Sequence, residues 1–320
     1  MNIDVYLGPE DLRRELEADA RAGLTASPKT LPPKWFYDER GSQLFEEITD
    51  LPEYYPTRAE REILARHASD IAATTGVKTL VELGSGSSDK TRLLLDALHR
   101  HGTLARFVPL DVSESALRAA AAAINADYPD LDVHAIVGDF TSHLDRIPGG
   151  DGRMVAFLGG TIGNLVPVER AAFLSALRGV LQADEWLLLG TDLVKDEATL
   201  VAAYDDAAGV TAEFNRNVLR VLNRDLDGDF DPEAFVHVAR WDPDEEWIEM
   251  RLRAERAQAV HLKRLDLRVE FAAGEELRTE VSAKFRREGV AAELAAAGFA
   301  ARRWWTDRAG TFGVSVAQAV

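Results

Sequence analysis

The sequence predicts an α/β protein in which a Rossmann-like, doubly wound parallel sheet is joined to an additional α+β region containing an antiparallel sheet. Between residues 78 and 190, short apolar runs alternate with longer helical stretches, as in βαβ units whose sheet is covered on both faces. The first of these runs leads into a glycine-bearing turn. From 234 to 283, apolar and polar residues alternate with a period of two, which is typical of an antiparallel sheet with one dry and one wet face.

The elements of the parallel region can be placed in chain order. Helical patches are expected near 10–22, 40–48 and 57–70, the last opened by Thr57 as N-cap with Glu60 at the capping-box spacing. The expected strands are Lys78–Leu83, Arg106–Leu110, Val133–Val137, Met154–Leu158 and Glu185–Gly190. The expected helices between them are 89–100, Ser113–Ala126 and Val168–Leu181.

The second region breaks this rhythm after a helical stretch at 196–222. One expected strand carries Ile248, Met250, Leu252 and Ala254 on its dry face, and Trp247, Glu249, Arg251 and Arg253 on its wet face. The next alternates Leu265, Leu267, Val269 and Phe271 with charged residues. A helix at 284–297 and two strands within 300–318 close the chain, so the antiparallel part is inserted before the last strands of the parallel domain.

Composition excludes several classes of function. The 320 residues include 54 Asp and Glu against 37 Lys and Arg, which gives a formal net charge of −17. Nucleic acids and anionic membranes both require a basic surface, so we expect neither as a partner. The absence of cysteine excludes disulfides, thiolate metal sites and cysteine nucleophiles. With no signal peptide and no long apolar segment in the sequence, we expect a cytoplasmic protein, and we expect a monomer.

The clearest chemical signal is VELGSGSSDKT at 81–91, where a strand runs through Gly84 and Gly86 into a helix. A doubly wound sheet binds its ligand at such a place. The dinucleotide fingerprint GxGxxG would require glycine where Asp89 stands, and an aspartate at a helix start opposes a phosphate. A cationic or zwitterionic nucleoside such as S-adenosylmethionine therefore fits better than NAD. The alternative is a tight turn that binds nothing.

Two more strand ends carry acidic residues. Asp111 closes the second expected strand, where a carboxylate can accept both ribose hydroxyls; its alternative role is to cap the helix at Ser113. Asp139 and Phe140 follow the third strand, where they can meet the amino group and the ring of adenine, or simply form a turn. Three such features at successive strand ends favour a nucleoside site.

Longer motifs point to a family. They are WFYDERGSQLFEEITDLPEYYPTRAE (35–60), VELGSGSSDKT (81–91), FLGGTIGNL (157–165) and TEVSAKF (279–285). On these motifs, and nearly end to end, the chain resembles the histidine-specific N-alpha-methyltransferases of ergothioneine biosynthesis, of the actinobacterial type. In that family S-adenosylmethionine donates three methyl groups in turn to the α-amine of L-histidine. The products are hercynine (histidine betaine) and S-adenosylhomocysteine.

The resemblance implies a set of site residues. The methyl donor is expected at Gly84, Lys90, Asp111, Asp139, Phe140 and Gly159. L-histidine is expected at Tyr37, Tyr54, Asn164, Tyr204, Glu280 and Ser282, with Met250 lining the imidazole end and with Tyr37 and Asn164 in catalytic roles. The expected domains are an N-terminal segment 1–60 that packs with the substrate domain, a donor domain 61–195, an inserted substrate domain 196–285, and a return to the donor domain over 286–320.

The chemistry of these residue types agrees with such roles. An Asn164 side chain has a donor and an acceptor, so it can meet both the carboxylate and the amine of an amino acid. Glu280 and Ser282 are two residues apart on a strand and share a face, so they can bind the two imidazole nitrogens. Without the resemblance, Asn164 reads as a turn residue, the Glu280–Ser282 pair as an exposed strand face, and Tyr54 and Tyr204 as core aromatics.

Methyl transfer also constrains the mechanism. The nucleophile must be a neutral amine, and burial lowers the pKa of an ammonium group, so we expect desolvation and alignment rather than a strong base. Tyr37, or a water held by Tyr54, relays the proton. The alternatives are a methyltransferase for another amino acid or small amine, a nicotinamide oxidoreductase, and a non-catalytic donor-binding protein.

Three further patterns are interpreted as structural. His99 and His101 end a helix next to Gly102 and lack a third metal ligand nearby. The acidic run at 225–231 does not have the calcium-loop spacing. Trp304-Trp305 is expected to be strand packing. We therefore expect no metal.

Overall fold

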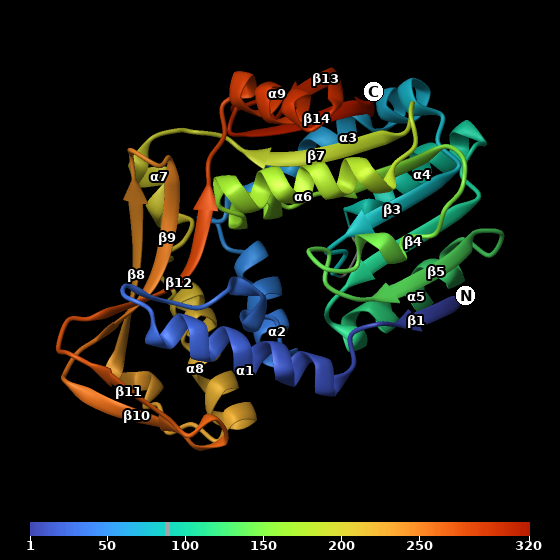
Figure 1. Ribbon diagram of the computed structural model, residues 1–320. Coiled ribbons are helices and arrows are strands. Elements are labelled where there is room, and N and C mark those ends of the chain that lie inside the picture. The colour runs from blue at the N-terminus through green and yellow to red at the C-terminus, as the bar shows by residue number, and fades with distance from the viewer. Residues whose placement is uncertain (87–89) are drawn as a thin grey trace. The chain divides into compact units, whose positions relative to one another are not determined.

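The computed structural model describes residues 1–86 and 90–320, and the chain forms two compact units (Figure 1). Unit 1 consists of Met1–Leu7, Pro56–Val194 and Lys284–Val320, and unit 2 of Gly8–Tyr55 and Lys195–Ala283. Each unit is therefore assembled from separate pieces of the sequence. The domain boundaries expected at residues 60, 195 and 285 stay a prediction.

Unit 1 contains one eight-stranded sheet in the order β1-β5-β4-β3-β6-β7-β14-β13. Its strands are β1 (Asn2–Val5), β3 (Thr79–Leu83), β4 (Arg106–Asp111), β5 (Asp132–Val137), β6 (Arg153–Phe157), β7 (Trp186–Asp192), β13 (Phe299–Thr306) and β14 (Phe312–Ala319). Its helices are α3 (Tyr55–Thr75), α4 (Thr91–His101), α5 (Glu114–Asp127), α6 (Pro167–Val180) and α9 (Arg287–Ala296), with short 3-10 turns η2 (Leu144–Arg146) and η3 (Thr161–Asn164).

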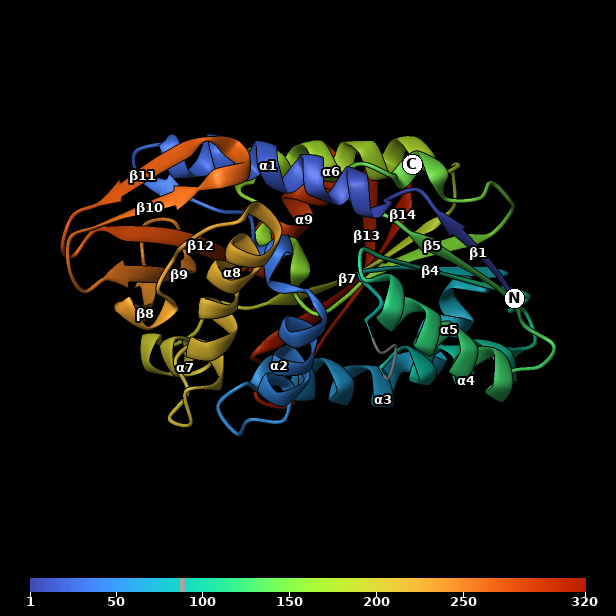
Figure 2. The ribbon, with the colours of Figure 1, turned by 90° about the horizontal axis from the view of Figure 1, so that it is seen from below.

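The predicted doubly wound fold is confirmed. Strands β5, β4, β3, β6 and β7 run parallel. In chain order these five strands have the spatial order 3-2-1-4-5, so the direction of winding reverses between β3 and β6. Helices α3, α4 and α5 lie on one face of the sheet, and α6 and α9 on the other (Figure 2). The two closing strands are confirmed as β13 and β14, with β14 antiparallel to β7.

Two local predictions in unit 1 need correction. Helix α3 begins at Tyr55, so Thr57 lies inside the helix and is not its N-cap. Glu60 is fully buried and cannot serve a solvent-exposed capping box there. Strand β1, which pairs parallel with β5 at the sheet edge, was not expected, because its four residues give too short a pattern to recognise.

Unit 2 contains a four-stranded sheet, in the order β2-β12-β9-β8, and a two-stranded sheet of β10 and β11. The strands are β2 (Lys29–Thr30), β8 (Phe235–Asp242), β9 (Trp247–Ala254), β10 (Gln258–Leu262), β11 (Leu267–Phe271) and β12 (Glu276–Ala283). The helices are α1 (Pro9–Thr25), α2 (Glu39–Thr49), α7 (Glu197–Ala202) and α8 (Val210–Leu226), with turns η1 (Pro33–Phe36), η4 (Pro232–Ala234) and η5 (Lys263–Leu265). The predicted antiparallel sheet is confirmed by the β8–β9 and β9–β12 pairs.

The two faces of β9 differ as predicted, with one exception. Ile248, Met250, Leu252 and Ala254 are all buried. On the opposite face Glu249 was expected in water, but its side chain is buried among Arg251, Arg240 and Arg278, which donate to it at 2.5, 2.7 and 3.3 Å. Burial alone would raise the pKa of Glu249, but these three guanidinium groups hold that pKa below its ordinary value. A carboxylate on the polar face of a strand can thus be buried when arginines on its own and neighbouring strands pair with it.

No helix among residues 1–86 and 90–320 is long and apolar enough to cross a membrane.

Two helical glycines provide a test of the packing. A Cβ atom on Gly41, in α2, would lie 1.6 Å from the carbonyl oxygen of Phe36, whereas one on Gly289, in α9, meets nothing within 4 Å. Gly41→Ala should therefore destabilise the protein by at least ~2 kcal/mol, and Gly289→Ala should stabilise it by ~0.5 kcal/mol. Thermal unfolding followed by far-UV circular dichroism compares them. Similar melting temperatures for both variants would contradict this close packing.

Candidate functional site

The parallel strands of unit 1 end at one level. Leu83 is in register with Leu110 on one side and with Phe157 on the other, and Asp111 is in register with Val137. The residues that follow these strands therefore emerge along one edge of the sheet. It is the carboxyl edge, next to the point where the winding reverses, where doubly wound folds bind ligands.

Hydrogen bonds donated by backbone N–H groups join three of these strand ends. The Gly84 N–H donates to the carbonyl of Leu110 at 2.8 Å, and the Gly86 N–H donates to Asp111 Oδ2 at 2.9 Å. The Gly138 N–H donates to the carbonyl of Asp111 at 3.0 Å. Gly84 and Gly86 have φ values of +66° and +48°, which favour glycine. The prediction about Asp89 falls on residues 87–89, outside the described part of the chain.

Asp111 does not cap the following helix. Helix α5 has Ser113 as its N-cap, and Asp111 Oδ1 accepts from the Ser113 N–H at 2.9 Å. Burial raises the pKa of Asp111 above its ordinary value, while N–H groups of Ser113, Gly86 and Val112 oppose that rise. Oδ1 accepts from the Ser113 N–H and Oδ2 from the Gly86 N–H, and an ionised carboxylate offers about four lone-pair positions. Asp111 therefore retains the capacity to accept a hydrogen bond from a ligand.

Asp139 and Phe140 form a turn next to Asp111. Asp139 is buried, and its Oδ1 accepts from the Thr141 N–H at 2.7 Å and from the Thr141 hydroxyl at 2.6 Å. The Phe140 ring packs edge-on against Phe157, with centroids 5.0 Å apart. The predicted turn is thus confirmed as local geometry. The Phe140 ring is only half-buried, so this turn leaves part of the ring accessible to a ligand.

Glu60 was missed as a site residue by sequence reasoning. Its carboxylate lies on α3, has no exposed surface, and accepts from Lys90 Nζ. It also accepts from the Gly159 N–H, at 2.8 and 3.0 Å from its two oxygens. Glu60 therefore connects Lys90 at the start of α4 with Gly159 after β6, two residues expected at the methyl donor. Its position on the apolar face of α3, between Ala59 and Ile63, is a signal that could have revealed it.

The aromatic residues expected at the amino acid pocket lie in unit 2. Tyr54 and Tyr204 are buried, with ring centroids 6.3 Å apart. The ring centroid of Phe45 lies 6.1 Å from that of Tyr54 and 5.6 Å from that of Tyr37. The ring centroids of Tyr37 and Phe214 are 5.5 Å apart. Tyr37 and Tyr54 are therefore linked through Phe45 in one cluster, whose rings mostly meet edge to face.

Glu280 and Ser282 lie on the inner face of the unit 2 sheet. Glu280 is in register with Met250 and Ser282 with Ile248, and opposite residues of an antiparallel pair share a face. Ser282 and Met250 are buried and Glu280 is half-buried, so the alternative of an exposed strand face is wrong. The Ser282 hydroxyl lies 2.8 Å from the Tyr204 hydroxyl. The structure thus brings together four of the residues expected at L-histidine, namely Tyr204, Met250, Glu280 and Ser282.

Asn164 belongs to unit 1. It is the last residue of η3, a 3-10 turn closed by a hydrogen bond from the Gly163 N–H to the carbonyl of Gly160. The turn follows Gly159, so Asn164 emerges at the carboxyl edge of the sheet together with the residues expected at the donor. Its side chain is half-buried.

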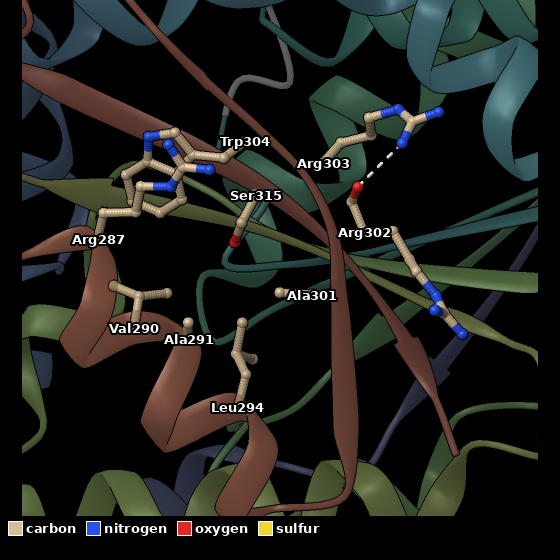
Figure 3. Close-up of a pocket in the computed structure, with 9 residues that line it drawn as sticks. All are labelled: Arg287, Val290, Ala291, Leu294, Ala301, Arg302, Arg303, Trp304 and Ser315. Atoms are coloured by element: carbon tan, nitrogen blue, oxygen red, sulfur yellow. Dashed lines mark hydrogen bonds between the residues drawn. The ribbon is translucent and has the colours of Figure 1, made fainter.

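A hollow in unit 1 of about 150 Å³ lies between α9 and strands β13 and β14 (Figure 3). None of the residues expected at the donor or at histidine lines it. Arg302 and Arg303 point away from its centre, and the Arg303 guanidinium donates to the carbonyl of Arg302 at 3.1 Å. Ser315 Oγ is buried there without a hydrogen-bond partner. One unpaired hydroxyl supplies no catalytic group, so this hollow is not the candidate site.

The histidine pair and the tryptophan pair, which were interpreted as structural, lie at a helix end and on a strand. His99 and His101 occupy the last turn of α4, before Gly102 in the left-handed conformation. Trp305 stacks on His67 of α3, with ring centroids 5.3 Å apart. Within residues 1–86 and 90–320, no group of three or more His, Cys, Asp or Glu side chains is arranged to hold a metal ion.

The fold class is that of the Rossmann-like, S-adenosylmethionine-dependent methyltransferases. Residues 16–319 match the family described as "Histidine-specific methyltransferase, SAM-dependent". The chain is 60% identical to the histidine N-alpha-methyltransferase of Mycolicibacterium smegmatis and 58% identical to that of Mycobacterium tuberculosis, in each case over 99% of both chains. It is 34% identical to ergothioneine biosynthesis protein 1 of Neurospora crassa over 67% of this chain and 26% of that protein. The chain belongs to the histidine-specific, S-adenosylmethionine-dependent methyltransferase family.

The Glu60 contacts give a stability prediction with a matched control. Glu60→Gln leaves the Lys90 ammonium, whose side chain is 24% exposed, without its carboxylate partner, and losing this charged hydrogen bond should cost ~2 kcal/mol. Glu62→Gln, two residues further along α3, removes exposed ion pairs with Arg66 and Arg308, keeps an acceptor for the Arg308 N–H, and should change stability by less than ~0.5 kcal/mol. Urea unfolding compares the two variants with the wild type. Equal losses would show that burial does not strengthen the Glu60 contacts.

Proposed function

We propose that this enzyme transfers methyl groups from S-adenosylmethionine to the α-amino group of L-histidine, three in turn, and so forms hercynine in the first step of ergothioneine biosynthesis. The observation that carries the substrate assignment is the inner face of β12, where half-buried Glu280 and buried Ser282 lie beside Tyr204. Family membership supports the donor and the reaction class. From the net charge of −17 we further propose that the enzyme has no nucleic-acid or membrane partner, and that it works as a cytoplasmic monomer.

In this proposal the carboxyl edge of the unit 1 sheet holds the donor. Asp111 accepts the two ribose hydroxyls, Asp139 accepts from the adenine amino group, and Phe140 packs on the base. Gly84 and Gly159 leave room for the donor to approach the backbone. Lys90, held by Glu60, lies beside Gly159. A Cβ atom added to Gly159 would be 3.8 Å from Lys90 Nζ. A cation at this place suits the donor's carboxylate end.

Two side chains recognise the imidazole. Glu280 accepts an N–H from one ring nitrogen, and the Ser282 hydroxyl, oriented by Tyr204, bonds the other. Met250, opposite Glu280 in the sheet, provides an apolar wall. A phenyl ring or an indole would leave at least one of these polar groups unpaired, and leaving a buried polar group unpaired is an effective way to reject a substrate.

Transfer requires a neutral amine aligned with the sulfonium methyl group. Asn164 holds the amino acid by its α-carboxylate and amine, which fixes the direction of attack. Removal from water lowers the pKa of the α-ammonium, so that its proton leaves without a strong base, through Tyr37 or a water held by Tyr54. The third transfer gives a permanent cation, which aromatic rings such as Tyr37 and Tyr54 can stabilise by cation–π contact.

One incubation tests the proposed function. The purified protein is mixed with S-adenosylmethionine and equimolar amounts of the twenty amino acids, and products are identified by mass spectrometry. Histidine alone should gain three methyl groups while S-adenosylhomocysteine accumulates. Methylation of another amino acid would retain the donor site and refute the imidazole pocket. Donor binding without any methylation would refute the proposed reaction.

A pair of variants on β12 tests the imidazole assignment. Glu280→Ala should raise KM for histidine at least ~10-fold, the effect of losing one hydrogen bond to a charged group, and should leave the affinity for S-adenosylmethionine unchanged. Glu276→Ala is the control, because Glu276 pairs with Arg251 on the outer face of the same strand. Initial rates with varied histidine at saturating donor give the histidine KM of both variants, and rates with varied donor at saturating histidine give the KM for the donor. An unchanged KM in Glu280→Ala would remove Glu280 from the pocket.

A further inference from the structure

The strand that carries Glu280 and Ser282 contains a β-bulge. The register of β12 with β9 runs from Leu277 opposite Leu252 to Glu280 opposite Met250, and shifts between Arg278 and Glu280. Thr279 is therefore an extra residue without a partner in the ladder. A bulge changes which face the following side chains occupy. Before it the odd-numbered Leu277 faces inward, and after it the even-numbered Glu280 and Ser282 do.

This bulge determines the chemistry of the inner face. With a regular register, Glu280 and Ser282 would continue the row of Glu276 and Arg278 on the outer, charged face. Val281, now opposite Glu249 on that outer face, would turn inward instead. An apolar residue would then replace the two groups proposed to bind the imidazole.

A buried asparagine holds the bulge. The Thr279 hydroxyl donates to Asn215 Oδ1 at 2.7 Å, and lies 3.1 Å from the carbonyl of Met250. Asn215, on α8, has no exposed surface, and Thr279 is 1% exposed. The Asn215 amide group also donates to the carbonyl of Arg251 on β9 at 3.1 Å. Because a carbonyl can only accept, this last bond fixes the orientation of the Asn215 amide.

His237 connects the Asn215 amide to the backbone of Tyr204. The Asn215 amide nitrogen lies 2.8 Å from His237 Nδ1, which must then be the acceptor. The proton of the neutral ring is therefore on Nε2, which donates to the carbonyl of Tyr204 at 2.7 Å. Burial lowers the pKa of His237 and keeps the ring neutral. The hydrogen bonds thus have one self-consistent arrangement, from the Thr279 hydroxyl to the Tyr204 backbone.

We infer that Asn215, His237 and Thr279 form a buried positioning network that sets the specificity of the imidazole pocket. One arm holds the bulge that turns Glu280 and Ser282 inward. The other arm holds the backbone of Tyr204, whose hydroxyl meets Ser282. The network touches no substrate in this scheme and acts through the residues it positions. The inference rests on the proposed function, since it concerns recognition of the histidine ring.

Thr279 allows a nearly isosteric test. Thr279→Val keeps the shape and removes the hydroxyl, whereas Thr279→Ser keeps the hydroxyl. The matched control is Val269→Ala, a buried truncation on β11, which pairs with β10 in a separate sheet from β12. Initial rates are measured against histidine at saturating donor and against donor at saturating histidine, together with melting temperatures.

Thr279→Val should raise KM for histidine about tenfold, the cost of one lost buried hydrogen bond with its partner left unpaired, with the KM for donor unchanged. Thr279→Ser should restore the histidine KM, and Val269→Ala should lower only the melting temperature. A histidine KM in Thr279→Val equal to that of Val269→Ala would overturn the inference, as would equal losses in the Val and Ser variants.

His237 gives a second test of the other arm. Glutamine can accept from Asn215 and donate to the Tyr204 carbonyl, so His237→Gln should retain a histidine KM close to that of the wild type. His237→Leu can do neither and should raise it by about the same factor as Thr279→Val. Indistinguishable KM values for these two variants would overturn the role of His237. A wild-type enzyme that does not methylate histidine would instead refute the proposed function, and this inference with it.

Discussion

The parallel register of four strands is the constraint on which the proposed donor site depends. Because β3, β4, β5 and β6 end at one level, residues far apart in sequence emerge along one edge of the unit 1 sheet. Loop amides then join these ends, from Gly84 and Gly86 to the end of β4 and from there to Gly138. The buried carboxylate of Glu60 adds the end of β6 and the start of α4. Each contact satisfies a backbone or charged group that would otherwise be costly to bury. The same hydrogen bonds therefore stabilise the fold and hold the proposed site residues in place.

In unit 2, too, buried polar groups must have hydrogen-bond partners. The proposed pocket for the histidine ring needs polar groups on an otherwise apolar sheet face, and regular alternation does not provide them there. The bulge at Thr279 does, at the cost of one ladder position. The extra residue is compensated by a hydrogen bond to Asn215, whose amide oxygen and amide nitrogen both have partners. Buried polar networks of this kind specify a structure only when every member is satisfied.

Much of the fold could be predicted from the sequence, because apolar runs and their spacing report the burial of whole elements. The five parallel strands, the antiparallel region and the closing pair were all placed within a few residues. The buried polar residues that the sequence pattern did not reveal share one cause. Glu60, Glu249 and Asn215 are polar residues with little or no exposed surface, and a sequence pattern assigns polar residues to solvent. Their partners come from distant elements, so neither burial nor pairing can be read from local periodicity.

The candidate site shows the same limit more sharply. The two-residue spacing of Glu280 and Ser282 correctly indicates that they share a face, but it does not say which face. That choice depends on a single inserted residue, because a shift of one position exchanges the two faces of a strand. No propensity marks Thr279 as a bulge, since threonine is an ordinary strand residue. The bulge depends on a tertiary contact, the hydrogen bond between Thr279 and Asn215 of α8. The tertiary contacts of Thr279 therefore decide which residues of β12 face inward, and the local sequence of the strand does not.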